Sequence, residues 1–379
     1  MLARSLDELK KIIRKIEFNK TEPELLVELV GKAMKAGEGE RQRLKHIREK
    51  SHELFKLLRD MDFFCQVQCD CNSINALNRV PVGSVDGSFQ VVGGAGGKYY
   101  AIFGISQVIA AEGFTFNPLI NVDGGIELLE AINEGDARKK AEILMMLGEI
   151  KGFRKVAEKL GAGGKSCYLL IDGPVIDPPI YMDEKYIEDR VDALRFCAER
   201  GVNAIGFVKR VMGSNFLNFL KDELGEPQVA DFTNDLDLLS TVMFNAVKES
   251  ARSIYTYPLN FDESVDKENG LSSTYKCYRN KGLIVYYSYY KPNLRSRIFR
   301  IEYASFEELS EPKVFEKFNE ILKIVNCVWT FPGMDEPLPI IIAHNKCNVR
   351  QGAAETLYYE IMTRALSEGD LHMFSESLT

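Results

Sequence analysis

Short apolar runs separated by polar segments dominate the middle of the chain and predict a sheet. Runs of this length, rich in Val, Ile, Tyr and Phe, are typical of buried strands. A helical pattern at 186–200 lies between two such runs, and this order favours a parallel crossover. The chain is therefore predicted to be α/β, with a mixed central sheet flanked by helices. The predicted strands span 82–85, 89–92, 99–110, 168–171, 202–208, 283–290, 297–303 and 338–343.

Helical periodicity dominates the N-terminal part of the chain and recurs near its other end. Apolar residues recur at helical spacing from Leu6 onward, and Ser5 with Glu8 has the spacing of a capping box. We expect an N-terminal helical region over 1–75, then a larger domain over 76–379 that carries an insertion of helices and loops at about 212–280. The predicted helices begin near residue 5 and then span about 22–35, 39–60, 126–160, 186–200 and 351–367.

Two Asp–Gly pairs each follow an apolar run, at Asp86-Gly87 and at Asp172-Gly173. This arrangement predicts that each Asp lies at the end of a strand, where the Gly lets the chain turn sharply. Two carboxylates that meet in space would form an oxygen-rich site suited to Mg²⁺ or Mn²⁺. The alternative is two unrelated turns, because Asp–Gly is a common turn dipeptide.

Composition and charge limit the classes of protein that this chain can represent. With 45% hydrophobic and 27% charged residues among 379, the chain is typical of a globular protein with a sizeable core. The net charge of −7 argues against a protein that coats nucleic acid non-specifically, although a local basic groove is compatible with it. The sequence has no apolar run long enough for a membrane span and no signal-peptide pattern, so we expect a cytoplasmic protein.

The eight cysteines lie mostly in apolar or strand-like surroundings, which predicts buried thiols in a reducing compartment. Cys65, Cys69 and Cys71 form a cluster that offers an alternative, a zinc site. The cluster lacks a matching second pair, so structural thiols are the favoured interpretation.

Four short motifs, in this order along the chain, resemble the NurA nuclease family. They are Ser84–Ser88, Leu170–Pro174 with Pro178-Pro179 after it, Gly206–Lys209 and Pro339–His344. The resemblance implies an RNase H-like fold and a nuclease that depends on Mn²⁺, with Mg²⁺ less effective. It further implies endonuclease and 5′→3′ exonuclease activity on single-stranded DNA, attack on duplex ends, and ring-like homodimers. Such dimers would work with the hexameric HerA translocase in DNA-end resection during double-strand break repair.

The resemblance also implies a set of metal ligands. Asp86 and Asp172 would supply two carboxylates, and His344 an imidazole, which suits Mn²⁺ better than Mg²⁺. The third carboxylate is expected from Glu149, which begins a stretch resembling the family's acidic helix, with Glu142 as the alternative seven residues earlier. Two divalent ions held in this way would supply an activated water and neutralise charge in phosphodiester hydrolysis.

Lys209 completes the expected catalytic residues. It would steady the scissile phosphate or an ionised water, and the alternative is a lysine at a strand end in solvent. For His344 the alternative is likewise a surface residue at the end of a strand.

Aromatic and basic residues alternate around 286–300, a pattern that suits contact with single-stranded DNA. The alternative, which we favour, is structural packing, since tyrosine is a good strand former. The charge run over 41–56 is interpreted as a solvated helix face and not as a DNA contact. The candidate DNA-contacting residues are Tyr286, Tyr287, Tyr289, Tyr290, Lys291, Arg295, Arg297 and Arg300.

Two other functions remain as hypotheses. A non-catalytic, ring-shaped DNA-binding adaptor of the translocase would bind its partner without cutting DNA. An actin-like ATPase is a weaker hypothesis, because the glycine cluster at 93–97 matches no phosphate-binding loop pattern.

Overall fold

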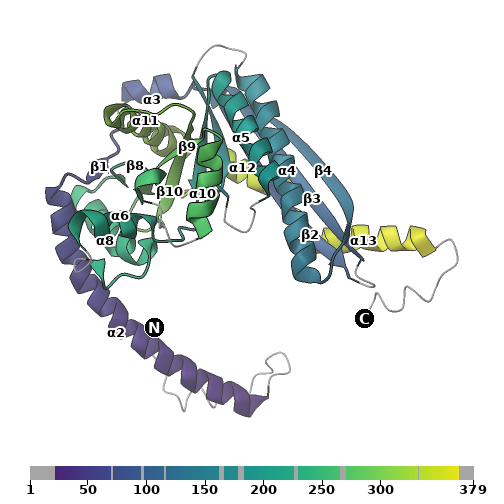
Figure 1. The fold of residues 1–379 in the computed structure, drawn as a ribbon, viewed down its shortest axis with the longest axis horizontal. Helices are drawn as coiled ribbons and strands as arrows, with labels where there is room; N and C mark the ends of the chain where they lie inside the picture. Colours follow the sequence, from purple (N-terminus) through teal and green to yellow (C-terminus); the bar gives the residue numbers. More distant parts are fainter. Residues whose placement is uncertain are drawn as a thin grey trace.

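A ten-stranded mixed sheet forms the centre of the protein, and helices cover both of its faces (Figure 1). The computed structural model describes residues 22–69, 71–94, 98–114, 117–161, 166–177, 183–225, 229–264, 270–331 and 333–366. The strand order is β1-β7-β9-β10-β6-β5-β2-β3-β4, and β8 pairs with β9. The strands are β1 Phe64–Gln66, β2 Val82–Gly93, β3 Lys98–Phe114, β4 Leu119–Glu130, β5 Cys167–Asp172, β6 Val202–Val208, β7 Ile254–Thr256, β8 Leu259–Asn260, β9 Ile284–Lys291 and β10 Phe299–Ser305.

The predicted parallel crossover is confirmed at the centre of the sheet. Strands β2, β5 and β6 are parallel to one another, and the other pairs are antiparallel. The helices are α2 Pro23–Asp60, α3 Cys71–Leu77, α4 Glu134–Leu160, α5 Glu184–Glu199, α6 Asn215–Leu224, α8 Asp235–Ser250, α9 Phe261–Ser264, α10 Gly270–Asn280, α11 Glu311–Ile324, the π-helical turn η4 Val325–Trp329, α12 Leu338–Cys347 and α13 Gln351–Leu366.

Two apolar cores lie on opposite faces of the sheet. The larger core packs α4, α5, α6 and α8 against one face, and the second packs α11 and η4 around Trp329 against the other. Side-chain caps fix where α4 and α8 begin. The side chain of Asn133 accepts a hydrogen bond from the backbone N–H of Asp136 at the start of α4, and Asn234 caps α8 in the same way.

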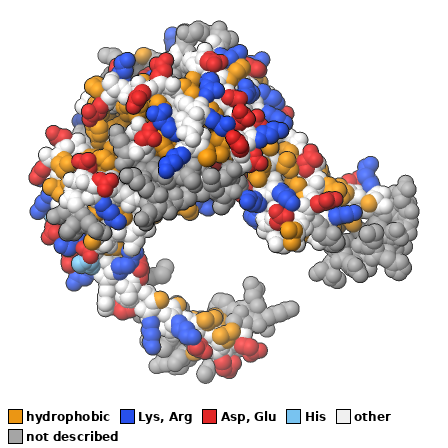
Figure 2. Space-filling model, in the orientation of Figure 1, with side chains coloured by type: hydrophobic (Ala, Val, Ile, Leu, Met, Phe, Trp, Pro, Cys, Tyr) orange, Lys and Arg blue, Asp and Glu red, His pale blue; other side chains and the backbone are white. Residues whose placement is uncertain are grey.

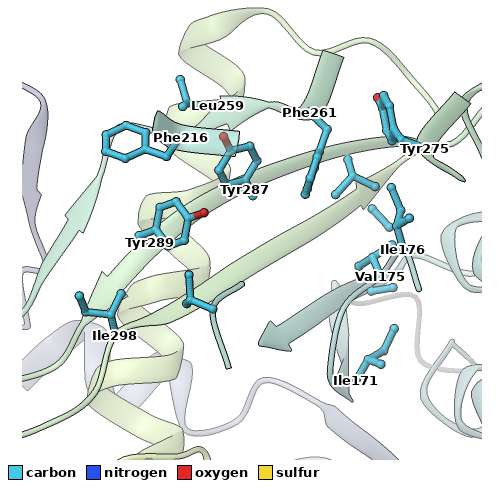
Figure 3. Close-up of a cluster of buried hydrophobic side chains, with 14 of the residues drawn as sticks. Ile171, Val175, Ile176, Phe216, Leu259, Phe261, Tyr275, Tyr287, Tyr289 and Ile298 are labelled. Atoms are coloured by element: carbon cyan, nitrogen blue, oxygen red, sulfur yellow. The ribbon is translucent and has the colours of Figure 1, made fainter. Parts of the chain in front are cut away.

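The tyrosines of β9 belong to the core, which rules out the alternative that they contact DNA. Figure 3 shows Tyr287 and Tyr289 packed among Phe216, Phe261 and other buried side chains. The hydroxyl of Tyr289 donates to a buried carboxylate, that of Asp235, at 2.5 Å. The basic residues Lys291 and Arg300 are also buried, while Arg295 and Arg297 are exposed. The favoured alternative, structural packing, holds for the tyrosines.

Three predicted boundaries are wrong. The two helices expected at 22–35 and 39–60 form the single helix α2, because its interior glycines each cost only about 1 kcal/mol relative to alanine. The helix expected over 126–160 begins only at Glu134, and 119–130 forms the edge strand β4. The run 338–343, expected as a strand, is the start of α12; Pro339 suits the first turn of a helix.

The segment 212–280 contains strands as well as the expected helices. Within it, β7 pairs with β9 and with β1, and β8 pairs with β9, so this segment extends the central sheet. Strand β1 lies within the N-terminal region 1–75, after the last helix predicted there, and no strand was predicted at this position. The domain boundary near residue 75 stays a prediction.

The basic residues of α2 lie on a solvated face, as predicted. Arg41 pairs with Glu38, and Arg43 pairs with Glu40 and with Asp237 of α8. Figure 2 shows basic and acidic side chains interspersed over the visible face of the molecule. Among the helices that the structure describes, none combines the length and apolarity that crossing a membrane requires.

The structure joins Cys69 and Cys327 in a disulfide, so the prediction of free thiols is wrong for these two. The bond links the segment after β1 to η4 across 258 residues of sequence. The free thiols Cys167, Cys197 and Cys347 are buried, as predicted, while the free thiols Cys65 and Cys277 are only partly buried. The zinc alternative at Cys65, Cys69 and Cys71 loses a ligand to the disulfide.

Some predictions lie outside the described residues. They are the first helix with its capping box at Ser5 and Glu8, the Pro178-Pro179 motif, part of the glycine cluster at 95–97, and the last residue of the helix predicted over 351–367.

Candidate metal centre

Three side chains that are far apart in the sequence converge near the middle of the sheet. One ligand atom each from Asp86, Asp172 and His344 lies within 4.8 Å of the others, and no other such group of His, Cys, Asp and Glu occurs in the described part of the chain. His344 Nδ1 lies 2.9 Å from Asp86 Oδ2 and 3.8 Å from Asp172 Oδ2. The two aspartates are largely buried, while His344 is 55% exposed, so the group opens to solvent on one side.

The two aspartates reach this point in different ways. Asp172 is the last residue of β5, and Gly173 follows with a φ of 137°, as the predicted strand end requires. Asp86 is not at a strand end, which corrects the prediction. Strand β2 continues through it to Gly93, because the antiparallel pairing with β3 persists and sets Asp86 opposite Ser106.

The tripeptide Asp86-Gly87-Ser88 contributes to both faces of β2, because successive residues of a strand face opposite sides of the sheet. Ser88 Oγ donates to the carbonyl of Cys347 at 2.5 Å and accepts from the backbone N–H of Val349, which holds the end of α12 against the sheet. Ser106, opposite Asp86, likewise donates to a carbonyl of α12. Asp86 therefore faces the helix that carries His344.

Gly87 faces the opposite side, toward α4. A Cβ at this position would lie 2.8 Å from Glu149 Oε1 and 2.7 Å from Met145 Cγ, so only glycine leaves room for this close approach of the helix. Glu149 thus lies directly beside Asp86, on the far face of β2. It stands outside the group of three ligands, and the alternative, Glu142, lies two helical turns away along α4, roughly 10 Å.

Lys209 joins the site through two carboxylates. Its Nζ lies 2.8 Å from Asp172 Oδ2 and 2.8 Å from Glu336 Oε2. Arg297 contacts the other oxygen of Glu336 at 3.7 Å. Lys209 is therefore not a free lysine in solvent, and it contacts the same oxygen of Asp172, Oδ2, that lies 3.8 Å from His344 Nδ1.

Sequence reasoning missed two residues of this site, Glu336 and Cys347. Glu336 lies in the loop before α12, and its only signal was an acidic pair next to Pro337. Cys347 Sγ donates to Asp86 Oδ2 at 3.5 Å. It lies three residues after His344, and the two share a face only because 338–347 is a helix.

The site carries an excess of negative charge. Burial, together with the charge of Asp86, raises the pKa of Asp172 to about 6, although Lys209 donates to it. Burial also raises the pKa of Asp86, against the opposing effect of His344. Burial and the neighbouring aspartates raise the pKa of Glu149 well above its usual value. Burial lowers the pKa of Lys209, but Asp172 and Glu336 outweigh it and leave the pKa raised.

A buried ion pair supports the loop that follows Asp172. Arg190 of α5 lies 3.2 Å from Asp177, and both side chains are almost fully buried. Arg190 also donates to the backbone carbonyls of Pro174 and Val175. The hydroxyl of Tyr186 donates to Asp177 at 2.5 Å. These bonds fix residues 173–177 and thereby the end of β5 that carries Asp172.

A second buried pair holds the same loop from the sheet. Glu302 of β10 accepts a hydrogen bond from the backbone N–H of Val175 at 2.7 Å and pairs with Arg300 at 2.6 Å. Burial therefore places Arg300 in a structural role and not on a DNA-binding surface.

Metal binding at this site is expected to weaken as the pH falls from 7 to 5. A metal ion binds the ionised carboxylate, and the folded protein protonates Asp172 below about pH 6. Competition from this single proton lowers the affinity by about tenfold over that range. Calorimetric titration with Mn²⁺ at a series of pH values measures this loss of affinity. A Mn²⁺ affinity that stays constant between pH 7 and 5 contradicts the proposed role of Asp172.

Comparison with known proteins finds solved structures of similar fold. The chain is 15% identical to the NurA nuclease from Sulfolobus solfataricus in its crystal structure, with a TM-score of 0.54; the match covers 93% of this chain and 99% of that chain. A second NurA structure gives 12% identity and a TM-score of 0.39 over 74% of this chain and 88% of that one. The crystal structure of human endonuclease V is 13% identical, with a TM-score of 0.37; the match covers 80% of this chain and 99% of that chain.

The search of curated proteins found no match. The mixed sheet flanked by helices confirms the predicted RNase H-like fold class. The model of the NurA domain matches residues 80–349, well over half of the chain. This span includes every strand from β2 to β10 and all three converging side chains. The chain therefore belongs to the NurA family and is a deoxyribonuclease.

Proposed function

We propose that this NurA protein is a manganese-dependent nuclease that cuts single-stranded DNA internally and degrades it from the 5′ end, with Mg²⁺ less effective. The observation that carries the proposal is the convergence of Asp86, Asp172 and His344 within 4.8 Å. Two carboxylates and one imidazole are a donor set that suits Mn²⁺, because a neutral nitrogen ligand favours it over Mg²⁺.

The charges around the site fit a divalent cation. Asp86, Asp172 and Glu149 lie in one region, and burial raises the pKa of each; the charge of Asp86 raises the pKa of Asp172 and of Glu149 further. Asp86, Asp172 and His344 would hold the ion. Glu149 would add negative charge from the opposite face of β2, where the missing side chain of Gly87 lets its carboxylate come close to the strand. A bound divalent ion supplies Lewis acidity and lowers the pKa of a coordinated water.

Lys209 would serve as the residue that meets the scissile phosphate. It lies between Asp172 and Glu336, and its raised pKa keeps it charged at neutral pH. A fixed ammonium at this position can offset the charge that develops on the phosphate oxygens. Glu336 and Asp172 hold the ammonium group in place beside the metal ligands.

The wider role of this chain follows from its family membership. We infer that it acts in DNA-end resection at double-strand breaks, on single strands and duplex ends, as a cytoplasmic homodimer with a hexameric HerA-type ATPase. Membership of the NurA family supports these inferences.

Cleavage of end-labelled DNA tests the proposal. The purified protein is incubated with 5′- and 3′-labelled single strands and with a circular single strand, in Mn²⁺, Mg²⁺ or EDTA. We expect cutting of the circle and release of 5′-terminal mononucleotides in Mn²⁺, slower cutting in Mg²⁺, and none in EDTA. Light scattering measures the molecular mass in solution and so tests the homodimer. Co-purification with a HerA-type ATPase tests binding to that partner.

The main competing hypothesis, a non-catalytic adaptor, makes a different prediction. An adaptor would bind the ATPase and DNA but leave all three substrates intact in Mn²⁺. That result would overturn the proposed activity and leave the family assignment unchanged.

A further inference from the structure

A basic pocket lies away from the metal centre, next to the Cys69–Cys327 disulfide. It has a volume of about 870 Å³ and is formed where four segments meet: the residues after β1, the end of α8 with the loop to β7, the loop after β9, and Asn326 of η4. Its charged lining residues are Lys248, Arg252 and Arg295, and no carboxylate lines it. Because the chain as a whole carries a net charge of −7, a pocket with only positive charges is a local exception.

The three cations of this pocket are exposed and lack a counter-ion among the residues that the structure describes. Within the described ranges, none of them forms an ion pair, whereas Arg41, Arg59 and other exposed arginines do. Lys248 lies in the last turn of α8, where a cation offsets the helix dipole. That effect accounts for Lys248 alone, because Arg295 comes from a different segment of the chain. Three unpaired cations that face one cavity indicate an anionic ligand.

The pocket lies at the same edge of the sheet as Asp172. The carboxyl ends of β5 and β6 pair with each other, and the end of β6 pairs with the start of β10. The start of β10 pairs in turn with the end of β9, which also pairs with the start of β7. Three strand spacings separate β5 from β9, which is about 14 Å at roughly 4.8 Å per spacing. The pairs that establish this alignment are Asp172 with Phe207, Val208 with Arg300, Phe299 with Tyr290, Lys291 with Ile254, and Ile254 with Gln66.

One loop connects the pocket to the metal centre. Residues 292–295 line the pocket, and Arg297, two residues on, contacts Glu336, which in turn holds Lys209 beside Asp172. Ser296 Oγ donates to Asp335 at 2.6 Å and fixes the loop between the two places. A chain of anionic groups that leaves the metal centre along this edge would meet Arg297 first and the pocket next.

The walls of the pocket are held in place. Ser253 Oγ lies 2.7 Å from the carbonyl oxygen of Pro292 and 2.8 Å from Asn326 Oδ1, and its single hydroxyl proton bonds to one of these acceptors at a time. The disulfide anchors Cys69, which also lines the pocket. No aromatic residue is among the lining residues, so the pocket offers no platform for base stacking. Its chemistry suits phosphate groups and not bases.

We propose that this pocket binds phosphodiester groups of the DNA substrate several phosphates away from the bond that is cut. The inference rests on the proposed nuclease function, because it takes the ligand to be the same strand that occupies the metal centre. Lys248, Arg252 and Arg295 neutralise the backbone without reading the sequence. The pocket therefore adds affinity for long single strands of any sequence.

Strand binding in EDTA, where no cleavage occurs, tests this proposal. The triple variant Lys248→Gln, Arg252→Gln, Arg295→Gln is compared with the control Lys32→Gln, Arg41→Gln, Arg364→Gln, which changes the net charge equally at exposed, ion-paired sites. The probe is fluorescein-labelled dT30, measured by anisotropy between 50 and 200 mM salt. We expect the pocket variant to bind at least about tenfold more weakly than the control, and its salt slope to fall by about 2.

The possible outcomes separate the sources of phosphate. Equal dT30 affinity in the two variants, or a loss with an unchanged salt slope, overturns the proposal. Binding of inorganic phosphate or thymidine 5′-monophosphate that depends on the pocket, with dT30 binding unaffected, assigns a free-phosphate site and also overturns it. If the triple variant unfolds at a lower temperature than the wild type, the single variant Arg295→Gln is tested in its place. We expect its salt slope for dT30 binding to fall by about 0.7, and an unchanged slope overturns the proposal.

The two proposals can fail separately. If the wild type cuts DNA in Mn²⁺ but the pocket variant binds dT30 like the control, the pocket inference is wrong and the nuclease function stands. If the pocket variant loses dT30 binding while the wild type cuts no DNA, the nuclease function is wrong and the pocket still binds strand phosphates.

Discussion

Replacement of Asp172 by Asn is expected to abolish metal-dependent cleavage and, at the same time, to stabilise the metal-free protein. Loss of the carboxylate removes a metal ligand, and the several kcal/mol that a metal contributes correspond to at least about a 1,000-fold loss in rate. The stabilisation arises because burial and Asp86 disfavour the ionised carboxylate, which Asn replaces with a neutral group of the same shape.

The sign of the stability effect depends on pH. The pKa of Asp172 rises from 3.8 to about 6 on folding, so between these values the folded state binds a proton that the unfolded state releases. The free energy of unfolding therefore falls as the pH rises from 4 to 6, and the full penalty is present above about pH 6. The variant should be more stable than the wild type by about 1–3 kcal/mol at pH 7.5 and equally stable at pH 4.

Urea unfolding in EDTA at both pH values, together with Mn²⁺-dependent cleavage, measures these effects. Asp192→Asn is the matched control, because Asp192 is exposed on α5 and, within the described part of the chain, forms an ion pair with Arg195 alone. It should change neither activity nor stability appreciably. If Asp172→Asn keeps its activity, or if it destabilises the metal-free protein at pH 7.5, the metal site as we propose it is wrong.

Replacement of Arg190 by Met is expected to destabilise the protein by about 3–5 kcal/mol. The change leaves Asp177 as an unpaired buried charge, and breaking one partner of a buried pair costs about this much. It also removes two hydrogen bonds to the backbone of the loop after Asp172. Urea unfolding measures the loss, and Mn²⁺ titration should show weaker binding, since the loop positions a ligand.

Two further variants make this prediction specific. Arg195→Met removes an arginine from the same helix, where the side chain is 41% exposed, and should cost no more than about 1 kcal/mol. The double variant Arg190→Met, Asp177→Asn removes the unpaired charge and should recover part of the stability. If Arg190→Met costs no more than Arg195→Met, the buried network does not stabilise the loop.

The sequence allowed the centre of the sheet and the converging residues to be predicted, each for a different reason. The crossover from β5 to β6 was readable because buried parallel strands are continuous apolar runs with a helix between them. Asp172 was correctly placed, because a strand that ends at Asp–Gly leaves few other positions for the carboxylate. His344 was predicted through a family motif and the wrong secondary structure, since a short apolar run fits a strand and a helix equally well.

The remainder of the site depends on contacts between distant segments. Nothing near Glu336 in the sequence indicates that Lys209, 127 positions earlier, pairs with it. The pairing of Arg190 with Asp177 required the packing of α5 on the loop. Strand β7 is only three residues long and carries no alternation that could reveal it. Local patterns specify elements, and these contacts arise only after the elements have packed.

The continuous run of β2 through Asp86-Gly87-Ser88 limits how this protein can vary. Alternation along the strand sends Asp86 toward α12, Gly87 toward α4 and Ser88 toward α12 again. Insertion or deletion of one residue within this stretch would exchange the two faces and drive a carboxylate against α4. Changes in length are therefore tolerable only outside 82–93, and three adjacent residues tie together the sheet and a helix on each of its faces.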